Sequence, residues 1–322
     1  MLLALITMFL VITINFFLAR FMPGNPLEHL VGQEEYYYLR EFNPDELARI
    51  AEKYAISGTV LHQYRNYLVS ILHFDFGIAY SNKQPVAENV LRSCHWTLVL
   101  TVPTLILGGL AGGLLGALAG WRPGKRFDRI STPIFLFIDT IPTNCIGILL
   151  LVTFAFKLHL FPVSGMTSGT KQGAAAILDV CWHACLPLII MVLFRTSGNF
   201  LLMKSSVSQV RQEDYLTTAR SKGLTERRVL LRHAVRSAML PYATSLCMQL
   251  GGLLSGSMLL EVIFGWKGMG QMFYNAVANR DFPTAQFCFL LSSVCVVGGN
   301  LLGDIMNGLL DPRVREEVQN EA

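Results

Sequence analysis

The side chain most able to do chemistry in this sequence is a carboxylate inside an apolar run. Asp139 stands in the segment FIDTIPTNC, whose neighbours are apolar enough to lie in a membrane. A charge at that depth is costly and marks a candidate functional residue by default. Two interpretations are open. Asp139 lines a polar path across the membrane, or it forms a structural ion pair, for example with Arg195 in another apolar run.

A second group combines sulfur and nitrogen ligands of the kind that bind transition metals. It consists of Cys181, His183 and Cys185. The alternative is ordinary packing, because the seven cysteines of the chain lie mostly in or beside apolar runs and form no CxxC pair. We therefore predict no metal site.

The sequence lacks the motifs that would make the chain an enzyme. No GxxxxGK[ST] phosphate-binding loop occurs, so a partner must hydrolyse any ATP that drives the protein. HExxH and GxSxG are also absent, which argues against a membrane protease or other hydrolase. We predict no catalytic residue and no cofactor bound by this chain.

The composition is that of a protein that crosses a membrane several times. Of the 322 residues, 52% are hydrophobic and 15% are charged, against about 25% charged in an average soluble domain. The mean hydropathy is +0.44. The net charge of +4 is no sign of a nucleic-acid partner, because in such a chain the position of the charges sets the topology.

Six apolar runs are long enough to cross a bilayer, which takes about 20 residues each. The predicted spans are residues 2–19, 97–120, 132–156 with an interruption at Pro142, 184–203, 241–263 and 285–310. The second span carries glycines every four residues. Such a ridge lets another helix approach closely, so we interpret it as packing. Its members are Gly108, Gly112, Gly116 and Gly120.

The polar segments between the spans divide the chain and set its orientation. Residues 21–96 form an extracytoplasmic insert, in which Asn43, Pro44 and the following acids predict a helix start. Residues 121–133 hold four Lys or Arg and residues 204–240 hold eight, so both are expected in the cytoplasm, as are both termini. The predicted domains are the first transmembrane helix (1–20), the insert (21–96) and a core of five spans (97–322), with a coupling loop at 204–240.

The most basic stretch, from Glu213 to Pro241, predicts two short helices. The first runs over residues 214–222 and ends at Gly223, which can adopt a positive φ. Thr225 can cap the second, with an acid in the first turn. Residues 231, 235 and 238 then share one apolar face. This pattern is typical of a docking element for a cytoplasmic partner.

At YLTTARSKGLTERRVLLRHAVRSAMLP the chain resembles the permease subunits of bacterial ABC importers of the peptide/nickel class. The alanine–glycine signature of that family is here ARSKGL, residues 219–224, and residues 217–219 replace its usual Glu-Ala-Ala. Further similar pieces, among them FMPGNP, LFPVSG and EVIFGWKGMGQ, extend the resemblance over nearly the whole chain.

The resemblance implies an all-α polytopic protein of the inner membrane, with six transmembrane helices in the type I ABC importer permease fold. Its partners would be a second homologous permease subunit, two cytoplasmic ATPase subunits that bind ATP and Mg, an extracytoplasmic substrate-binding protein and membrane lipid. The residues that would couple to an ATPase are Asp214, Tyr215, Ala219, Lys222, Gly223 and Leu224.

The resemblance also bears on the path and the substrate. Relatives have an apolar residue at Asp139 and aromatic residues at Asn144 and Cys145, so these departures indicate a more polar translocation path. Peptides delivered by the binding protein are the first expected substrate. Import of nickel or a metal chelate is the alternative, and a membrane scaffold that transports nothing is a third.

Overall fold

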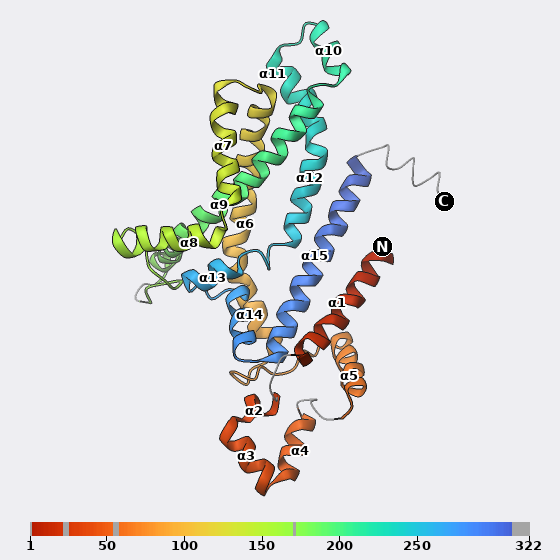
Figure 1. Cartoon of the computed structure of the whole chain (residues 1–322), viewed down its shortest axis with the longest axis vertical. Coiled ribbons are helices and arrows are strands. Elements are labelled where there is room, and N and C mark those ends of the chain that lie inside the picture. Colours follow the sequence, from red (N-terminus) through yellow and green to blue (C-terminus); the bar gives the residue numbers. More distant parts are fainter. Residues whose placement is uncertain (1, 22–25, 54–57, 170–171, 311–322) are drawn as a thin grey trace.

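The described part of the chain is built from helices (Figure 1). The computed structural model describes residues 2–21, 26–53, 58–169 and 172–310, where the only β-pairing is one bridge between Ile78 and Pro85. The elements are α1 (Leu2–Phe21), α2 (Pro26–Val31), α3 (Gln33–Phe42), α4 (Pro44–Lys53), α5 (Val60–Leu72), α6 (Val86–Trp121), α7 (Arg126–Thr140), α8 (Thr143–Leu150), the π-helix η1 (Leu151–Lys157), α9 (Ala174–Val210), α10 (Asp214–Ser221), α11 (Glu226–Val229), the π-helix η2 (Leu230–Ala234), α12 (Val235–Gly251), α13 (Met258–Phe264), α14 (Met269–Ala278) and α15 (Phe282–Leu310).

Three of these helices, α6, α9 and α15, are long and apolar enough to cross a membrane. A fourth span results if α7 and the α8–η1 segment count as one broken span. The count of six is therefore not confirmed. In α1 the apolar stretch is shorter, Leu3–Leu18. The fifth predicted span is not one helix, because α12 ends at Gly251 and α13 begins only at Met258.

The interruption predicted at Pro142 is confirmed, and it produces a sharp bend. Ile141 leaves the helical region, with φ −83° and ψ 134°, because a residue that precedes proline is disfavoured in the α conformation. The helices on the two sides of this break meet at 94°. In Figure 1, α8 accordingly points away from the long helices.

The glycine ridge of α6 packs against α9, as predicted. A Cβ atom at Gly116 would lie 2.5 Å from the carbonyl oxygen of Phe200, and one at Gly120 would lie 2.5 Å from that of Lys204. Only a residue without a side chain allows the two backbones to come this close. This contact fixes α9, and with it the segment that follows α9.

A buried carboxylate joins three helices in the part of the molecule between α10 and the α2–α4 segment (Figure 1). Glu261 in α13 is fully buried and accepts hydrogen bonds from Thr97 Oγ1 at 2.8 Å, Ser257 Oγ at 2.6 Å and the Gln271 amide at 3.1 Å. Gly268 lies so close that a Cβ there would collide with this carboxylate. These bonds join α13, α14 and α6 into one unit.

Between α1 and α6, the described residues (26–53 and 58–85) form four short helices. The start of α4 at Pro44 agrees with the predicted helix start, and α2, α3 and α4 lie at the far end of the molecule from α10 (Figure 1). Asp281 connects this segment to the start of α15, since it accepts hydrogen bonds from the amide and hydroxyl of Ser81 and the amide of Tyr80.

Candidate coupling site and membrane path

The predicted docking element forms a helical hairpin at one tip of the molecule (Figure 1). After α9, a short turn leads into α10, which begins at Asp214 as expected and ends at Ser221. Gly223 has φ +78°, a conformation that glycine adopts at little cost and other residues rarely adopt. Its amide donates to the carbonyl of Arg220 at 2.9 Å. The turn predicted at Gly223 is therefore confirmed.

The second helix begins where it was predicted to begin, but its cap and its faces differ from the prediction. The Thr225 carbonyl accepts from the amides of Arg228 and Val229, while its side chain makes no capping bond. A π-helical turn, η2, follows at once. Because such a turn holds more residues than an α-helical turn, the apolar face shifts: Leu231 is 58% exposed, whereas Leu230 is buried.

Below the hairpin lies an apolar core to which six helical elements contribute buried side chains. Leu216 and Ala219 of α10 are buried in it, and Leu224 packs against it. The other buried members come from α6, α9, α11, η2 and α12; they are Ala117, Trp121, Met203, Val207, Val229, Leu230, Ala234, Ala238 and Tyr242. Because these side chains interdigitate, α10 cannot shift without displacing the ends of α9 and α12.

The six predicted coupling residues divide into two groups. Asp214, Tyr215, Lys222 and Gly223 are exposed, so a partner can reach them. Ala219 and Leu224 face the protein's own core and support the hairpin from below. The Tyr215 hydroxyl is hydrogen-bonded to Ser237 Oγ at 2.8 Å, which ties the exposed face of α10 to α12.

An ion pair that the sequence analysis did not predict links the two helices of the hairpin. Arg220 Nε lies 3.0 Å from Glu226 Oε1, and the guanidinium carbon is 5.3 Å from the centre of the Trp121 ring, within cation–π range. The two ionic partners are six residues apart on different helices, so no helical periodicity could have indicated the pair.

A second ion pair at the same end fixes α7 to α9. Lys204 Nζ lies 2.6 Å from Asp128 Oδ1 and donates to Thr132 Oγ1 at 2.7 Å. Asp128 also accepts from the amide of Gly124 at 2.8 Å. The loop that joins α6 to α7 is therefore held against the same helix that leads into α10.

The three candidate path residues lie around the break between α7 and α8. Asp139 and Cys145 are exposed and Asn144 is half-buried. Asp139 Oδ1 is 3.7 Å from the position of a Cβ on Gly198, so this carboxylate lies against α9. The structure shows no ion pair between Asp139 and Arg195, although both lie in its described part.

A polar contact that sequence reasoning also missed joins α9 to α12. The Gln249 amide nitrogen donates to Asn199 Oδ1 at 2.9 Å and to Ser245 Oγ at 3.1 Å. Asn199 lies one turn beyond Arg195 on α9. Amides at this depth hydrogen-bond across helices because lipid offers them no other partner.

The structure does not gather the cysteine and histidine ligands of α9. His183 Nδ1 is 2.7 Å from the carbonyl oxygen of Asp179, and Cys181 is exposed while Cys185 is half-buried. Among the described residues, no group of three or more His, Cys, Asp or Glu side chains is placed to hold a metal ion.

Comparisons with known proteins agree on one class of relatives. The sequence profile of the binding-protein-dependent transport system inner membrane component family matches residues 112–316. The chain is 30% identical to the dipeptide transport system permease protein DppB of Escherichia coli K12, over 94% of each chain. It is also 30% identical to the oligopeptide permease protein AppB of Bacillus subtilis, over 94% of this chain and 93% of the relative. The metal-staphylopine import permease CntB of Staphylococcus aureus NCTC 8325 is 30% identical as well, over 85% and 84%.

Proposed function

Because this chain belongs to the binding-protein-dependent transport system inner membrane component family, we propose that it forms one half of the channel of a peptide importer. A second, homologous permease subunit supplies the other half. Two cytoplasmic ATPases drive the complex, and an extracytoplasmic binding protein delivers the peptide. In this proposal the basic segments around residues 121–133 and 204–240, which lie at the same end of the molecule (Figure 1), face the cytoplasm, and both termini lie on that side of the membrane.

The main support for this proposal is the exposed hairpin, which packs on an apolar core shared with α6, α9 and α12. Asp214, Tyr215, Lys222 and Gly223 present a polar surface to the cytoplasm, while Leu216 is buried among residues of α6, α9, η2 and α12. An ATPase that binds the hairpin is therefore connected through this core to the ends of α6, α9 and α12. ATP binding and release then move these helices between inward-open and outward-open arrangements.

The test is a proline substitution at the tip of the hairpin. Gly223→Pro should abolish uptake, because proline fixes φ near −65° where the chain needs +78°, and because it removes the bond from the Gly223 amide to Arg220. Gly124→Pro is the matched control. Gly124 has φ +76°, its amide is also hydrogen-bonded, and it lies in the other cytoplasmic loop.

Uptake of a radiolabelled peptide and the amount of assembled complex in the membrane are measured together for both variants. We expect normal assembly with lost uptake for Gly223→Pro, and a much smaller loss of uptake for Gly124→Pro. Equal uptake in Gly223→Pro and the unaltered protein would contradict the proposal that this hairpin couples the permease to its ATPase. Equal losses in the two variants would show that cytoplasmic loop strain alone stops transport.

A second candidate substrate is a metal chelate, and a relative of the same identity supports it. CntB is named for metal–staphylopine import, and this chain exposes Asp139 and Cys145 beside the break in its third predicted span. We propose that these two residues, with Asn144, line the translocation path. The reconstituted complex with its binding protein separates the substrates: peptides alone should stimulate its ATPase activity, whereas stimulation only by Ni²⁺ with a small chelator would establish the second function.

A further inference from the structure

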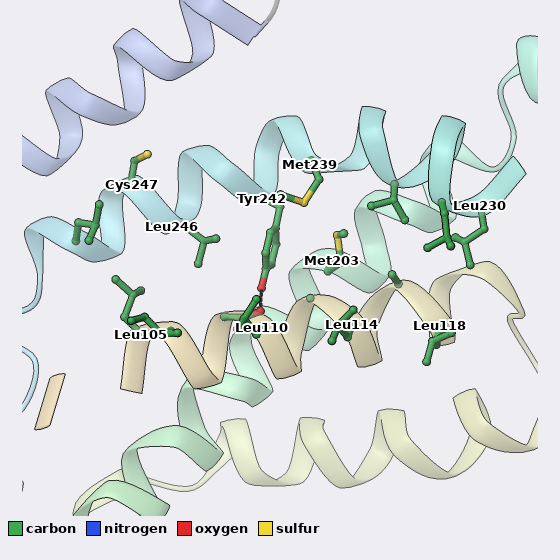
Figure 2. Close-up of a pocket in the computed structure, with 17 residues that line it drawn as sticks. Leu105, Leu110, Leu114, Leu118, Met203, Leu230, Met239, Tyr242, Leu246 and Cys247 are labelled. Atoms are coloured by element: carbon green, nitrogen blue, oxygen red, sulfur yellow. Dashed lines mark hydrogen bonds between the residues drawn. The ribbon is translucent and has the colours of Figure 1, made fainter. Parts of the chain in front are cut away.

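An elongated cavity lies between α6 and α12, on the membrane side of the coupling core. Its volume is about 540 Å³. Figure 2 shows Leu110, Leu114 and Leu118 along α6, facing Met239 and Tyr242 on α12. Leu110, Leu114 and Leu118 are each more than half exposed, so the cavity is a groove that opens sideways.

The dimensions of the groove fit an extended hydrocarbon chain. The lining residues of α6 run from Leu105 to Leu118, which at 1.5 Å per residue is about 20 Å of helix. A groove of this length and volume is long and narrow, a shape that suits a single extended chain.

The lining offers an occupant almost no polar contact. Tyr242 is the one lining side chain that carries an oxygen or nitrogen atom, and its hydroxyl donates to the carbonyl of Gly109 at 2.5 Å. Because that donor is already bonded, the groove selects for an apolar occupant rather than for a peptide or another polar solute.

Two arginines lie close in sequence to lining residues at the hairpin end of the groove. Arg122 follows the last residue of α6, four residues after the lining residue Leu118, and Arg227 lies in α11, four residues before the lining residue Leu231. Both arginines are exposed, and the structure shows neither of them in an ion pair within its described part. An anion at this end would meet a positive charge on each side of the groove.

We propose that the groove holds one acyl chain of an anionic phospholipid from the cytoplasmic leaflet, with the lipid phosphate between Arg122 and Arg227. The orientation is that of the proposed function, and it places the arginines at the surface where anionic lipids attract basic residues. Leu230 and Leu231 of η2 line the same groove, so the lipid chain packs directly beneath the coupling hairpin. The lipid chain reversibly occupies the space between α6 and α12, two helices that the coupling core joins.

The proposal is tested by photocrosslinking in lipid. The complex carrying Leu114→p-benzoylphenylalanine is purified into nanodiscs that contain neutral and anionic phospholipid in equal amounts. After illumination, mass spectrometry identifies the crosslinked species. Leu107 is the matched control position, since it is exposed on α6 but lies outside the groove. We expect position 114 to crosslink anionic lipid in excess over neutral lipid, and position 107 to crosslink the two equally.

Charge variants test the other half of the proposal. In the background of the position-114 probe, Arg122→Gln and Arg227→Gln should each lower the preference for anionic lipid about fivefold. Arg126→Gln, a charge at the start of α7 on the same side of the membrane, should leave the preference unchanged. Neither transport nor ATP is needed, so failure here is separate from failure of the proposed function.

Two results would overturn the proposal. A crosslink from position 114 to the partner permease would make the groove a subunit interface. Equal labelling of neutral and anionic lipid at position 114, unaffected by the two arginine substitutions, would reduce the groove to ordinary lipid-facing surface.

Discussion

Replacing Gly116 by alanine should force α6 and α9 apart at the end of these helices that carries the coupling hairpin. A Cβ at this position would lie 2.5 Å from the Phe200 carbonyl oxygen, 3.0 Å from Met203 Cβ and 3.1 Å from the Lys204 amide nitrogen. Carbon–oxygen contacts between helices are normally about 3.3–3.6 Å, so the backbones must separate by about 1 Å. Two of the three neighbours are backbone atoms, which cannot rotate out of the way.

The cost follows from overpacking in a close helix contact. Such insertions destabilise by about 1–3 kcal/mol, and the better helix propensity of alanine returns roughly 0.5–1 kcal/mol. Gly298→Ala supplies the control, because Gly298 lies in α15 with nothing within 4 Å of an added Cβ. Gly298→Ala gains the same helix propensity but creates no steric clash. The difference in stability between the two variants therefore measures the cost of the clash at Gly116.

Thermal unfolding of the purified complex in detergent measures this difference. We expect Gly116→Ala to unfold at a lower temperature than the unaltered protein, and Gly298→Ala at the same or a higher temperature. Uptake should fall with Gly116→Ala, because α9 leads directly into α10. Equal midpoints for the two alanine variants would refute the close packing of α6 on α9 at Gly116, and with it the rigid connection assigned to α9.

Two further predictions concern the buried Glu261 carboxylate and the charges of Asp139 and Arg195. Gly268→Ala should destabilise the complex and lower its amount in the membrane, because the new methyl group displaces the Glu261 carboxylate from its buried donors; quantitative immunoblotting checks this, and an unchanged amount would contradict it. Exchanging the charges in an Asp139→Arg, Arg195→Asp double variant should not restore uptake lost in either single variant, since the structure shows no ion pair between the two. Restored uptake would support structural pairing instead.

The elements near the coupling hairpin could be predicted because each has a local cause. A helix stop at Gly223 and a break at Pro142 follow from the positive φ of glycine and from the geometry before proline. The glycine ridge of α6 was equally readable, since a spacing of four residues places small residues on one face of a helix.

The features that could not be predicted depend on contacts between distant segments or on irregular turns. The ion pair between Arg220 and Glu226 can form only once the hairpin has folded and brought the two side chains together. The π-helical turn η2 rotates Leu231 out of the buried face, and no residue type announces such a turn. The sequence also predicted a single span where the structure has α12 and α13, because the apolar run continues through the turn at residues 252–257.

Two regions of the molecule are held together by different kinds of contact, and this difference bears on how the proposed motion could occur. The coupling end relies on an apolar core with side chains from α6, α9, α10 and α12, whereas Glu261 and its donors fix α6, α13 and α14 to one another through directional bonds. Between these regions, α7 ends at Thr140, just before Pro142, and α12 ends at Gly251. Hinges are typically a few residues at the ends of helices. A pull on α10 would therefore be carried by α9, α12 and the core as one body, and it would be absorbed at these two breaks rather than at the Glu261 cluster.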